Sequence, residues 1–331
     1  MKTARVLAAP ALLLALAGLA LASIWLGARP LALAEVWHLL WQPDDSIASA
    51  VVWELRLPRT ALAVVVGAAL GLAGGLMQAL TRNPLADPGL LGVNAGAALA
   101  VVLAMSVLGI TAFEGYVVFA LAGAGLAALG VYALSSGASP GTQRVRLLLA
   151  GTAISASLAA CTGIITLFDS QTFDGYRFWM VGALEGRGAG VLWLTLPFVV
   201  LGSGLALAQA RALDALALGD DFGQALGLRL PRVRLWSFIA IALLSGAATA
   251  AAGPIGFIGL VVPHAVRLLV GPNWRRVLPY CLLAGPVLVL ASDVLGRLIA
   301  RPAEIEVGIV SAFVGAPVLL WLICRPREAT P

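Results

Sequence analysis

Long apolar stretches, separated by short charged or Pro/Gly-containing breaks, run through almost the whole chain. Each stretch is continuously apolar rather than alternating, which excludes a membrane β-barrel. In lipid only a helix satisfies its own backbone over such a run, and about 20 residues are needed to cross. The pattern therefore predicts an all-α membrane protein, a single integral domain over residues 1–331. Its ten predicted spans are 6–28, 60–80, 90–110, 116–136, 146–168, 191–210, 233–253, 255–270, 277–298 and 305–324.

The composition supports a location in the bilayer. Apolar residues make up 61% of the chain and charged residues 11%, against about 45–50% and about 25% in soluble domains. The first apolar stretch resembles a secretory signal, because Lys2 and Arg5 precede it. It is longer, however, than the roughly 7–15 apolar residues of a signal peptide. We expect a retained first helix, with a cleaved signal as the alternative.

The distribution of basic residues predicts how the chain is oriented. With the N-terminus in the cytoplasm, inner segments hold fourteen Lys and Arg residues and outer segments seven, so the positive-inside rule places both termini in the cytoplasm of the inner membrane. The inner residues are Lys2, Arg5, Arg82, Arg144, Arg146, Arg211, Arg229, Arg232, Arg234, Arg267, Arg275, Arg276, Arg325 and Arg327. The outer residues are Arg29, Arg56, Arg59, Arg177, Arg187, Arg297 and Arg301.

Two further patterns concern packing and symmetry. Gly67, Gly71 and Gly75 share one helix face, which predicts close helix contacts, because small residues let backbones approach in lipid. The tetrapeptide Arg-Leu-Pro-Arg occurs at 56–59 and again at 229–232, each time before a span that ends at a Gly/Pro break. Matching interrupted segments of opposite orientation are typical of inverted-repeat transporters. We predict a first repeat over 56–168 and a second, inverted repeat over 229–324.

Residues for catalysis or energy coupling are missing. A nucleotide-binding P-loop needs a lysine, and the chain has only Lys2, so we expect no ATP hydrolysis here, no catalytic residue and no bound cofactor or metal. An ion-coupled carrier usually keeps paired ionisable residues near mid-membrane, whereas nearly all sixteen acidic residues fall in loops or at helix ends. For His264, a packed structural histidine is the stronger interpretation, against a ligand to a metal centre or a passing iron porphyrin. For His38, an interfacial cluster with Trp37 and Trp41 explains the residue at least as well as ligand contact does. Cys161, Cys281 and Cys324 are expected to be inert thiols.

The segment 211–234 is the most unusual inner loop. Its apolar residues predict two short amphipathic helices, divided near Gly219 and ended by Gly227. Two interpretations stay open on the residues alone. The segment is either a connector on the membrane surface or an element that docks onto a soluble partner.

Several strings together resemble the permease family of ATP-binding-cassette importers for iron complexes and cobalamin. They extend over nearly the whole chain in family order. They are Arg56-Leu-Pro-Arg59, Gly67-Ala-Ala-Leu-Gly71, Met77-Gln78, Arg82-Asn-Pro-Leu-Ala-Asp-Pro88, Leu91-Gly92, Leu147-Leu-Leu-Ala-Gly151, Leu218-Gly219, Ala225-Leu-Gly227, Gly253-Pro-Ile-Gly-Phe-Ile-Gly-Leu-Val-Val-Pro-His264, Val307-Gly-Ile-Val and Gly315-Ala-Pro317.

The resemblance implies a type II importer subunit of ten helices that pairs with a second copy around a substrate path. Its partners are then two ATPase subunits, which bind ATP and Mg²⁺, a periplasmic binding protein, membrane lipid and no nucleic acid. The segment 211–232 is similar to the family's ATPase-coupling helices, and Asn83 and Leu85 to a cytoplasmic gate. The implied coupling residues are Leu213, Leu216, Gly219, Asp220, Phe222, Ala225, Leu226 and Gly227.

Arg56, Arg59 and Arg297 match arginines that receive acidic residues of the binding protein. The outer segments carry eleven acidic residues against seven arginines, so we expect these three to form discrete positive points on an acidic face. If exposed, each ion pair contributes about 0.2–1 kcal/mol and weakens with salt. The alternative is that Arg56 and Arg59 only anchor their helix at the lipid headgroups.

Three classes of function follow. The importer permease is the first, an ion-coupled secondary carrier on the same repeat is the second, and a membrane enzyme is the weakest. For the substrate we rank haem slightly ahead of a ferric siderophore, with cobalamin third. No residue in the sequence decides this order.

Overall fold

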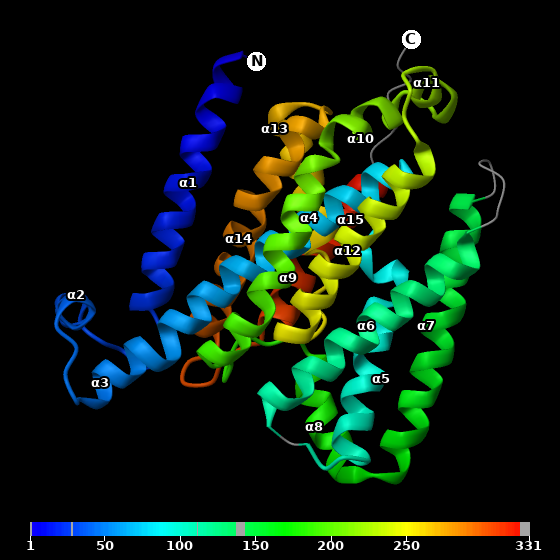
Figure 1. The fold of residues 1–331 in the computed structure, drawn as a ribbon. Helices are drawn as coiled ribbons and strands as arrows, with labels where there is room; N and C mark the ends of the chain where they lie inside the picture. The colour runs from blue at the N-terminus through cyan, green and yellow to red at the C-terminus, as the bar shows by residue number, and fades with distance from the viewer. Residues whose placement is uncertain (1, 28, 111, 137–142, 325–331) are drawn as a thin grey trace.

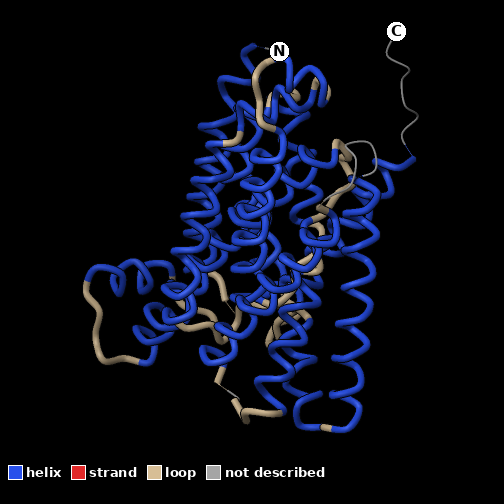
Figure 2. The backbone as a smooth tube through the Cα atoms, turned by 45° about the vertical axis from the view of Figure 1, so that its right-hand side comes forward, coloured by secondary structure: helices blue, strands red, loops and turns tan. Residues whose placement is uncertain are grey.

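The structure, a computed structural model, describes residues 2–27, 29–110, 112–136 and 143–324. Every regular element in these ranges is helical (Figure 2). In chain order the elements are α1 (Lys2–Trp25), α2 (Leu33–Trp41), α3 (Ile47–Ala50), the π-helix η1 (Val51–Arg56), α4 (Leu57–Thr81), the 3₁₀ helix η2 (Pro88–Leu91), α5 (Val93–Ser106), α6 (Phe113–Ser135), α7 (Gln143–Phe168), α8 (Ser170–Met180), α9 (Ala189–Ala208), α10 (Ala210–Ala217), α11 (Asp220–Ala225), α12 (Leu230–Ala252), α13 (Ile258–Val270), α14 (Trp274–Ile299) and α15 (Val307–Cys324).

Helices form at all ten predicted stretches. Seven of them, among the described residues, are long and apolar enough to cross a membrane, and α5, α13 and α15 are shorter apolar helices. The predicted third span is wrong in one respect, because 90–110 is not one helix. Gly92 has φ +73° and separates η2 from α5, so the chain turns before the span begins. Ala28, the predicted end of the first span, lies outside the described residues, as do Arg325 and Arg327.

The most buried spans are α4 and α12, which pack on one another at the centre of the bundle. α4 also packs along α14 and α13, whereas α12 packs on α6 and α9 (Figure 1). α1 and α7 lie at the periphery and bury little of their surface within the chain. The core is therefore built around the first helix of each predicted repeat.

The predicted close helix contacts are confirmed. A Cβ built on Gly67 lies 2.6 Å from the backbone of Pro286 in α14, and one on Gly71 lies 2.8 Å from the Cys281 carbonyl. One built on Gly74 overlaps the Gly259 backbone in α13. No larger residue fits at these positions without moving a helix.

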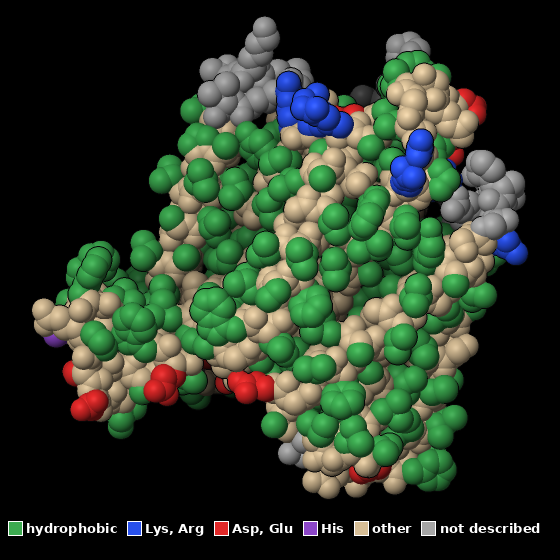
Figure 3. Space-filling view, in the orientation of Figure 1, with side chains coloured by type: hydrophobic (Ala, Val, Ile, Leu, Met, Phe, Trp, Pro, Cys, Tyr) green, Lys and Arg blue, Asp and Glu red, His purple; other side chains and the backbone are tan. Residues whose placement is uncertain are grey.

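The two ends of the bundle differ in charge. α10, α11 and the start of α1 lie at one end, and α2, α3 and α8 lie at the other (Figure 1). In the view of Figure 3, Lys and Arg side chains gather at the α10–α11 end, called the basic end below. Asp and Glu side chains gather at the α2–α8 end, called the acidic end. This asymmetry agrees with the predicted division into inner and outer segments.

The two predicted repeats share local features. α4 and α12 each have Pro in the first turn, at Pro58 and Pro231. Each ends at a residue of positive φ, Arg82 or Gly253, and each is followed by a short helix, α5 or α13. α4 runs towards the basic end and α12 away from it (Figure 1). The repeat boundaries themselves stay a prediction.

Candidate functional site

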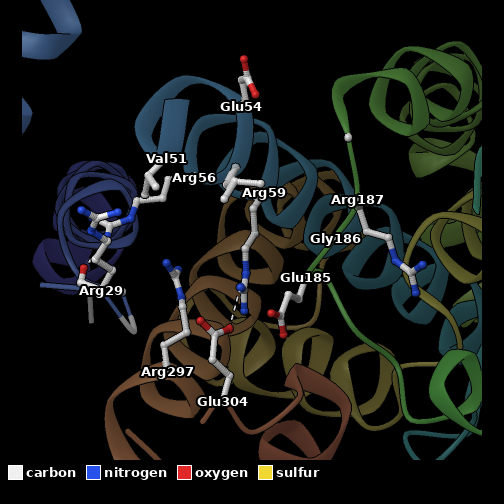
Figure 4. A pocket seen from close by; sticks show the side chains of 13 residues that line it. Arg29, Val51, Glu54, Arg56, Arg59, Glu185, Gly186, Arg187, Arg297 and Glu304 are labelled. Atoms are coloured by element: carbon white, nitrogen blue, oxygen red, sulfur yellow. Dashed lines mark hydrogen bonds and ion pairs between the residues drawn. The ribbon is translucent and has the colours of Figure 1, made fainter. Parts of the chain in front are cut away.

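A pocket of about 400 Å³ lies at the acidic end, beside the junction of η1 and α4. Gly27 and Arg29 after α1, the loop between α8 and α9, the end of α14 and the loop before α15 complete its wall. Arg59 and Glu304 point towards one another in it, whereas Arg187 points away (Figure 4). Its lining residues are Gly27, Arg29, Val51, Glu54, Leu55, Arg56, Arg59, Glu185, Gly186, Arg187, Gly188, Arg297 and Glu304.

Asp293 on α14 binds two of the arginines that line this pocket. Arg59 donates to Asp293 Oδ1 from Nε at 3.0 Å and from Nη2 at 2.7 Å. Arg297 Nη2 donates to the other oxygen, Oδ2, at 2.6 Å. Arg59 Nη1 also donates to Glu304 Oε2 at 2.7 Å. Such charge-assisted bonds are short and strong, and here they join α4, α14 and the loop before α15.

Arg56 and Arg297 also hold the end of α1. Arg56 donates to the carbonyl oxygens of Ile24, Trp25 and Arg29, at 3.0, 2.6 and 2.6 Å. Arg297 Nη1 donates to the Ser23 and Leu26 carbonyls at 2.8 and 2.9 Å. The four last carbonyls of a helix lack intrahelical partners. Guanidinium groups supply partners to several of the carbonyls where α1 ends.

The expectation that Arg56, Arg59 and Arg297 are exposed positive points is wrong. Their exposed fractions are 5%, 9% and 2%. Arg59 is ion-paired with Asp293 of another helix, and Arg297 with the same carboxylate on its own helix. Arg56 instead donates to backbone carbonyls at the end of α1. A contribution to binding-protein docking stays a prediction, but it cannot rest on freely exposed side chains.

Sequence reasoning missed Asp293, Glu304, Glu185 and Arg187 as members of this site. Arg187 lies over the Phe113 ring, 3.0 Å from its centroid, and burial lowers the pKa of Arg187 to about 10. Burial and the nearby Glu185 raise the pKa of Glu306 above its usual range. The spacing of Asp293 and Arg297, one helical turn apart, is the one signal in the sequence that could have indicated the pair.

The predicted break in the 211–232 segment is confirmed, with α10 before Gly219 and α11 after it. Gly219 has φ +128° and Gly227 has φ +81°, a backbone region in which only glycine is unstrained. We call residues 210–227, at the basic end, the coupling segment. Its two helices therefore meet at a turn whose shape depends on glycine.

The coupling segment has an inner and an outer face. Leu213 and Leu216 are buried against the bundle core, so they anchor α10 rather than contact a soluble partner directly. Their predicted role in coupling stays a prediction. Phe222 and Leu226 are exposed, together with Leu218, and Ala225 is exposed beside them. An apolar patch on an aqueous end of a protein indicates a binding surface.

The two predicted gate residues follow α4 directly. Asn83 Oδ1 accepts a hydrogen bond from the Leu85 backbone N–H at 3.0 Å, which closes a tight turn. The Leu85 side chain is exposed at the basic end of α4. Whether this turn closes a substrate path in a pair of chains stays a prediction.

No cluster of three His, Cys, Asp or Glu residues in the described ranges could hold a metal ion. His38 lies in α2 at the acidic end and His264 follows Pro263 within α13, so the two do not share a site. The expectation that the chain itself binds no cofactor stays a prediction.

These features together define a multi-pass membrane protein. Its buried helices meet at glycines, its acidic end is ion-paired, and its basic end carries an apolar patch. Residues 13–325 match the model of the FecCD transport family. The chain belongs to this family, whose members are membrane transport permeases rather than catalytic enzymes.

Individual relatives extend the match. The chain is 44% identical to the ferric enterobactin transport system permease protein of Escherichia coli (strain K12), over 97% of this chain and 96% of that one. It is 40% identical to the hemin transport system permease protein of Yersinia pestis, over 96% and 95%. A solved structure described as an inward-facing metal-chelate type ABC transporter superposes with a TM-score of 0.82 at 27% identity, covering 95% of this chain and 97% of that one.

Proposed function

We propose that the chain is the permease subunit of an ATP-binding-cassette importer that carries a bulky iron(III) complex across the inner membrane into the cytoplasm. Two separate ATPase subunits supply the energy, and a periplasmic binding protein delivers the complex to the acidic end. Both termini lie in the cytoplasm. The family match over 13–325 and the names of the two relatives support this proposal.

The observation that carries the proposal is the apolar patch of Leu218, Phe222 and Leu226 on the coupling segment. A self-contained secondary carrier has no need of such a patch at a charged, water-facing end. A soluble subunit that buries Phe222 and Leu226 in a groove explains it. The basic residues at the same end agree with a cytoplasmic location.

A second copy of the chain is the proposed partner within the membrane. Only 11% of the apolar stretch of α7 is buried within the chain, and its exposed residues include Thr152 and Ser157, which carry hydroxyl groups. Both hydroxyls bond to carbonyls of their own helix. A moderately polar, uncovered helix of this kind suits a path between two copies better than contact with lipid alone.

For the substrate we now place a ferric siderophore ahead of haem, with cobalamin third, which reverses the first two places of the order expected from the sequence. The higher identity to the ferric enterobactin permease, 44% against 40% for the hemin permease, supports this order. Titrating the companion binding protein with ferric enterobactin, hemin and cyanocobalamin tests it directly. Tightest binding of hemin or cyanocobalamin would overturn the order.

The energy source separates the importer from an ion-coupled carrier. We expect proteoliposomes that contain the permease, its ATPase subunits and the loaded binding protein to take up ferric enterobactin only when ATP reaches the ATPase side. Uptake should persist after a protonophore collapses the proton gradient. Uptake without ATPase subunits, driven by an imposed proton or sodium gradient, would instead establish the secondary carrier.

Replacing Gly219 or Gly227 by valine should uncouple hydrolysis from transport. A Cβ at either position meets no atom within 4 Å, so the change acts through backbone strain, which costs about 1–3 kcal/mol. We expect normal membrane expression and ATP hydrolysis, with uptake reduced about fivefold or more. Ala217→Val, at an exposed helical position of α10, is the matched control. If both glycine variants take up substrate at the wild-type rate, the coupling segment is only a connector between α9 and α12.

A further inference from the structure

The carboxylate of Asp220 lies between two arginines from different spans. Arg82 Nη2 lies 2.6 Å from Asp220 Oδ1, and Arg234 Nη2 lies 2.7 Å from Asp220 Oδ2. The side chains of Arg82, Asp220 and Arg234 are 28%, 16% and 19% exposed. Each oxygen thus has its own guanidinium partner, in a partly desolvated setting where such bonds hold their geometry better than on an open surface.

The three residues lie at the ends of three different helices. Asp220 is the first residue of α11, in the coupling segment. Arg82 ends α4 in a left-handed conformation, φ 51°, and is followed at once by Asn83. Arg234 lies at the start of α12. One carboxylate therefore joins the coupling segment to the first helix of each predicted repeat.

Apolar packing holds α11 only weakly. Gly223 is its buried residue, whereas Phe222 points outwards and is exposed. α10, by contrast, is anchored through Leu213 and Leu216, and Asp214 Oδ1 accepts a bond from the Trp274 backbone at the start of α14. The ion pairs of Asp220 are thus a principal side-chain link between α11 and the spans.

The turn directly after Arg82 is built so that it moves together with Arg82. The Asn83–Leu85 hydrogen bond closes residues 83–85 into a compact turn, which is covalently attached to Arg82. A displacement of α11 that pulls Arg82 through Asp220 therefore shifts this turn as a unit. Without that hydrogen bond, the backbone dihedral angles of residues 83–85 could change instead, and the turn would not move with Arg82.

We propose that Asp220 is a positioning residue that transmits movement of α11 to the Asn83–Leu85 turn. This inference rests on the proposed function, because the ATPase subunits are what moves α11. It assigns Asp220 a role inside the permease and leaves Phe222 and Leu226 as the contacts to the ATPase. The competing role for Asp220 is direct contact with the ATPase.

The test uses the whole transporter in proteoliposomes, with ferric enterobactin as the transported probe. Leu85→Cys reports on the turn through its rate of labelling by a water-soluble maleimide, with and without ATP. Cys161 and Cys324, which are exposed, are replaced by serine, while buried Cys281 can stay. Asp220→Asn and Arg82→Gln break the link to α4. Asp221→Asn is the matched control, because it removes the same charge from the neighbouring, exposed position.

We expect Asp220→Asn and Arg82→Gln to retain the ATPase subunits on co-purification and to hydrolyse ATP within about twofold of wild type. Both should lose the ATP-dependent change in labelling at position 85, and uptake should fall about tenfold, within the usual range of an allosteric coupling. Asp221→Asn should behave as wild type, and Asp220→Glu should restore part of the labelling change.

Two results would overturn the inference. One is loss of ATPase co-purification in Asp220→Asn, since that makes Asp220 a docking residue. The other is an unchanged labelling response and unchanged uptake in both variants. If Asp220→Asn is not recovered from membranes, Arg82→Gln decides by the same measurements. A wild-type transporter without ATP-dependent uptake would instead contradict the proposed function, so the two failures are distinguishable.

Discussion

Replacing Asp293 by asparagine should destabilise the permease by about 3–5 kcal/mol, the usual cost of removing one partner from a buried ion pair. The variant leaves Arg59 and Arg297 charged at 9% and 2% exposure with their shared carboxylate gone. The amide oxygen of asparagine can accept a bond but carries no charge to balance either guanidinium. Thermal unfolding in detergent and the yield in membranes measure the loss.

The exposed pair of Asp174 and Arg177 provides the matched control. Its atoms are 3.4 Å apart and both side chains are mostly exposed, so Asp174→Asn should cost less than about 1 kcal/mol. Equal effects of the two asparagine variants would mean that the buried Asp293 network contributes no more to stability than an exposed ion pair.

Replacing Gly74 by alanine should have the second-largest effect, a loss of about 2–3 kcal/mol. The added Cβ would overlap the Gly259 backbone of α13, and main chain cannot move aside as a flexible side chain can. Separating α4 from α13 would also stretch the bonds that Gln78 donates to the Gly259 and Leu260 carbonyls, at 3.3 and 3.1 Å. Thermal unfolding and sensitivity to protease in native membranes report the change.

Gly204→Ala is the control variant. It tests whether the loss in Gly74→Ala comes from the contact with α13 or from replacing any helical glycine. Gly204 lies within α9, and a Cβ there meets no atom within 4 Å. We expect its unfolding midpoint to stay close to that of the wild type. A midpoint for Gly74→Ala that also matches the wild type would show that α4 and α13 separate without cost.

Much of the fold could be predicted because each span is encoded locally. Continuous apolar runs fix where helices form, and glycines such as Gly67 and Gly71 indicate close contacts before the partner helix is known. The break at Gly219 was also predictable. A glycine between two short amphipathic runs ends one helix and permits a turn that other residues avoid.

The acidic-end site could not be predicted in the same way, because its partners are far apart in sequence. Arg59 lies 234 residues from Asp293 and 245 residues from Glu304. The charge count placed Arg59, Asp293 and Glu304 in outer segments, but it did not indicate that these three side chains pair with one another. Periodicity likewise found the apolar residues of the coupling segment. It could not assign Leu213 to the core and Phe222 to the surface, since their directions depend on the backbone turn at Gly219.

The contacts of α1 also have a consequence for biosynthesis. α1 packs chiefly on α14, a helix that leaves the ribosome about 250 residues later. Because α1 is apolar, it is stable in the bilayer as an independent helix before α14 is synthesised. Ser23 and the carbonyl of Leu26 are thereby already in the membrane when Arg297 arrives. Assembly of the acidic end is thus a late step, because Asp293 and Glu304 are made 234 and 245 residues after Arg59.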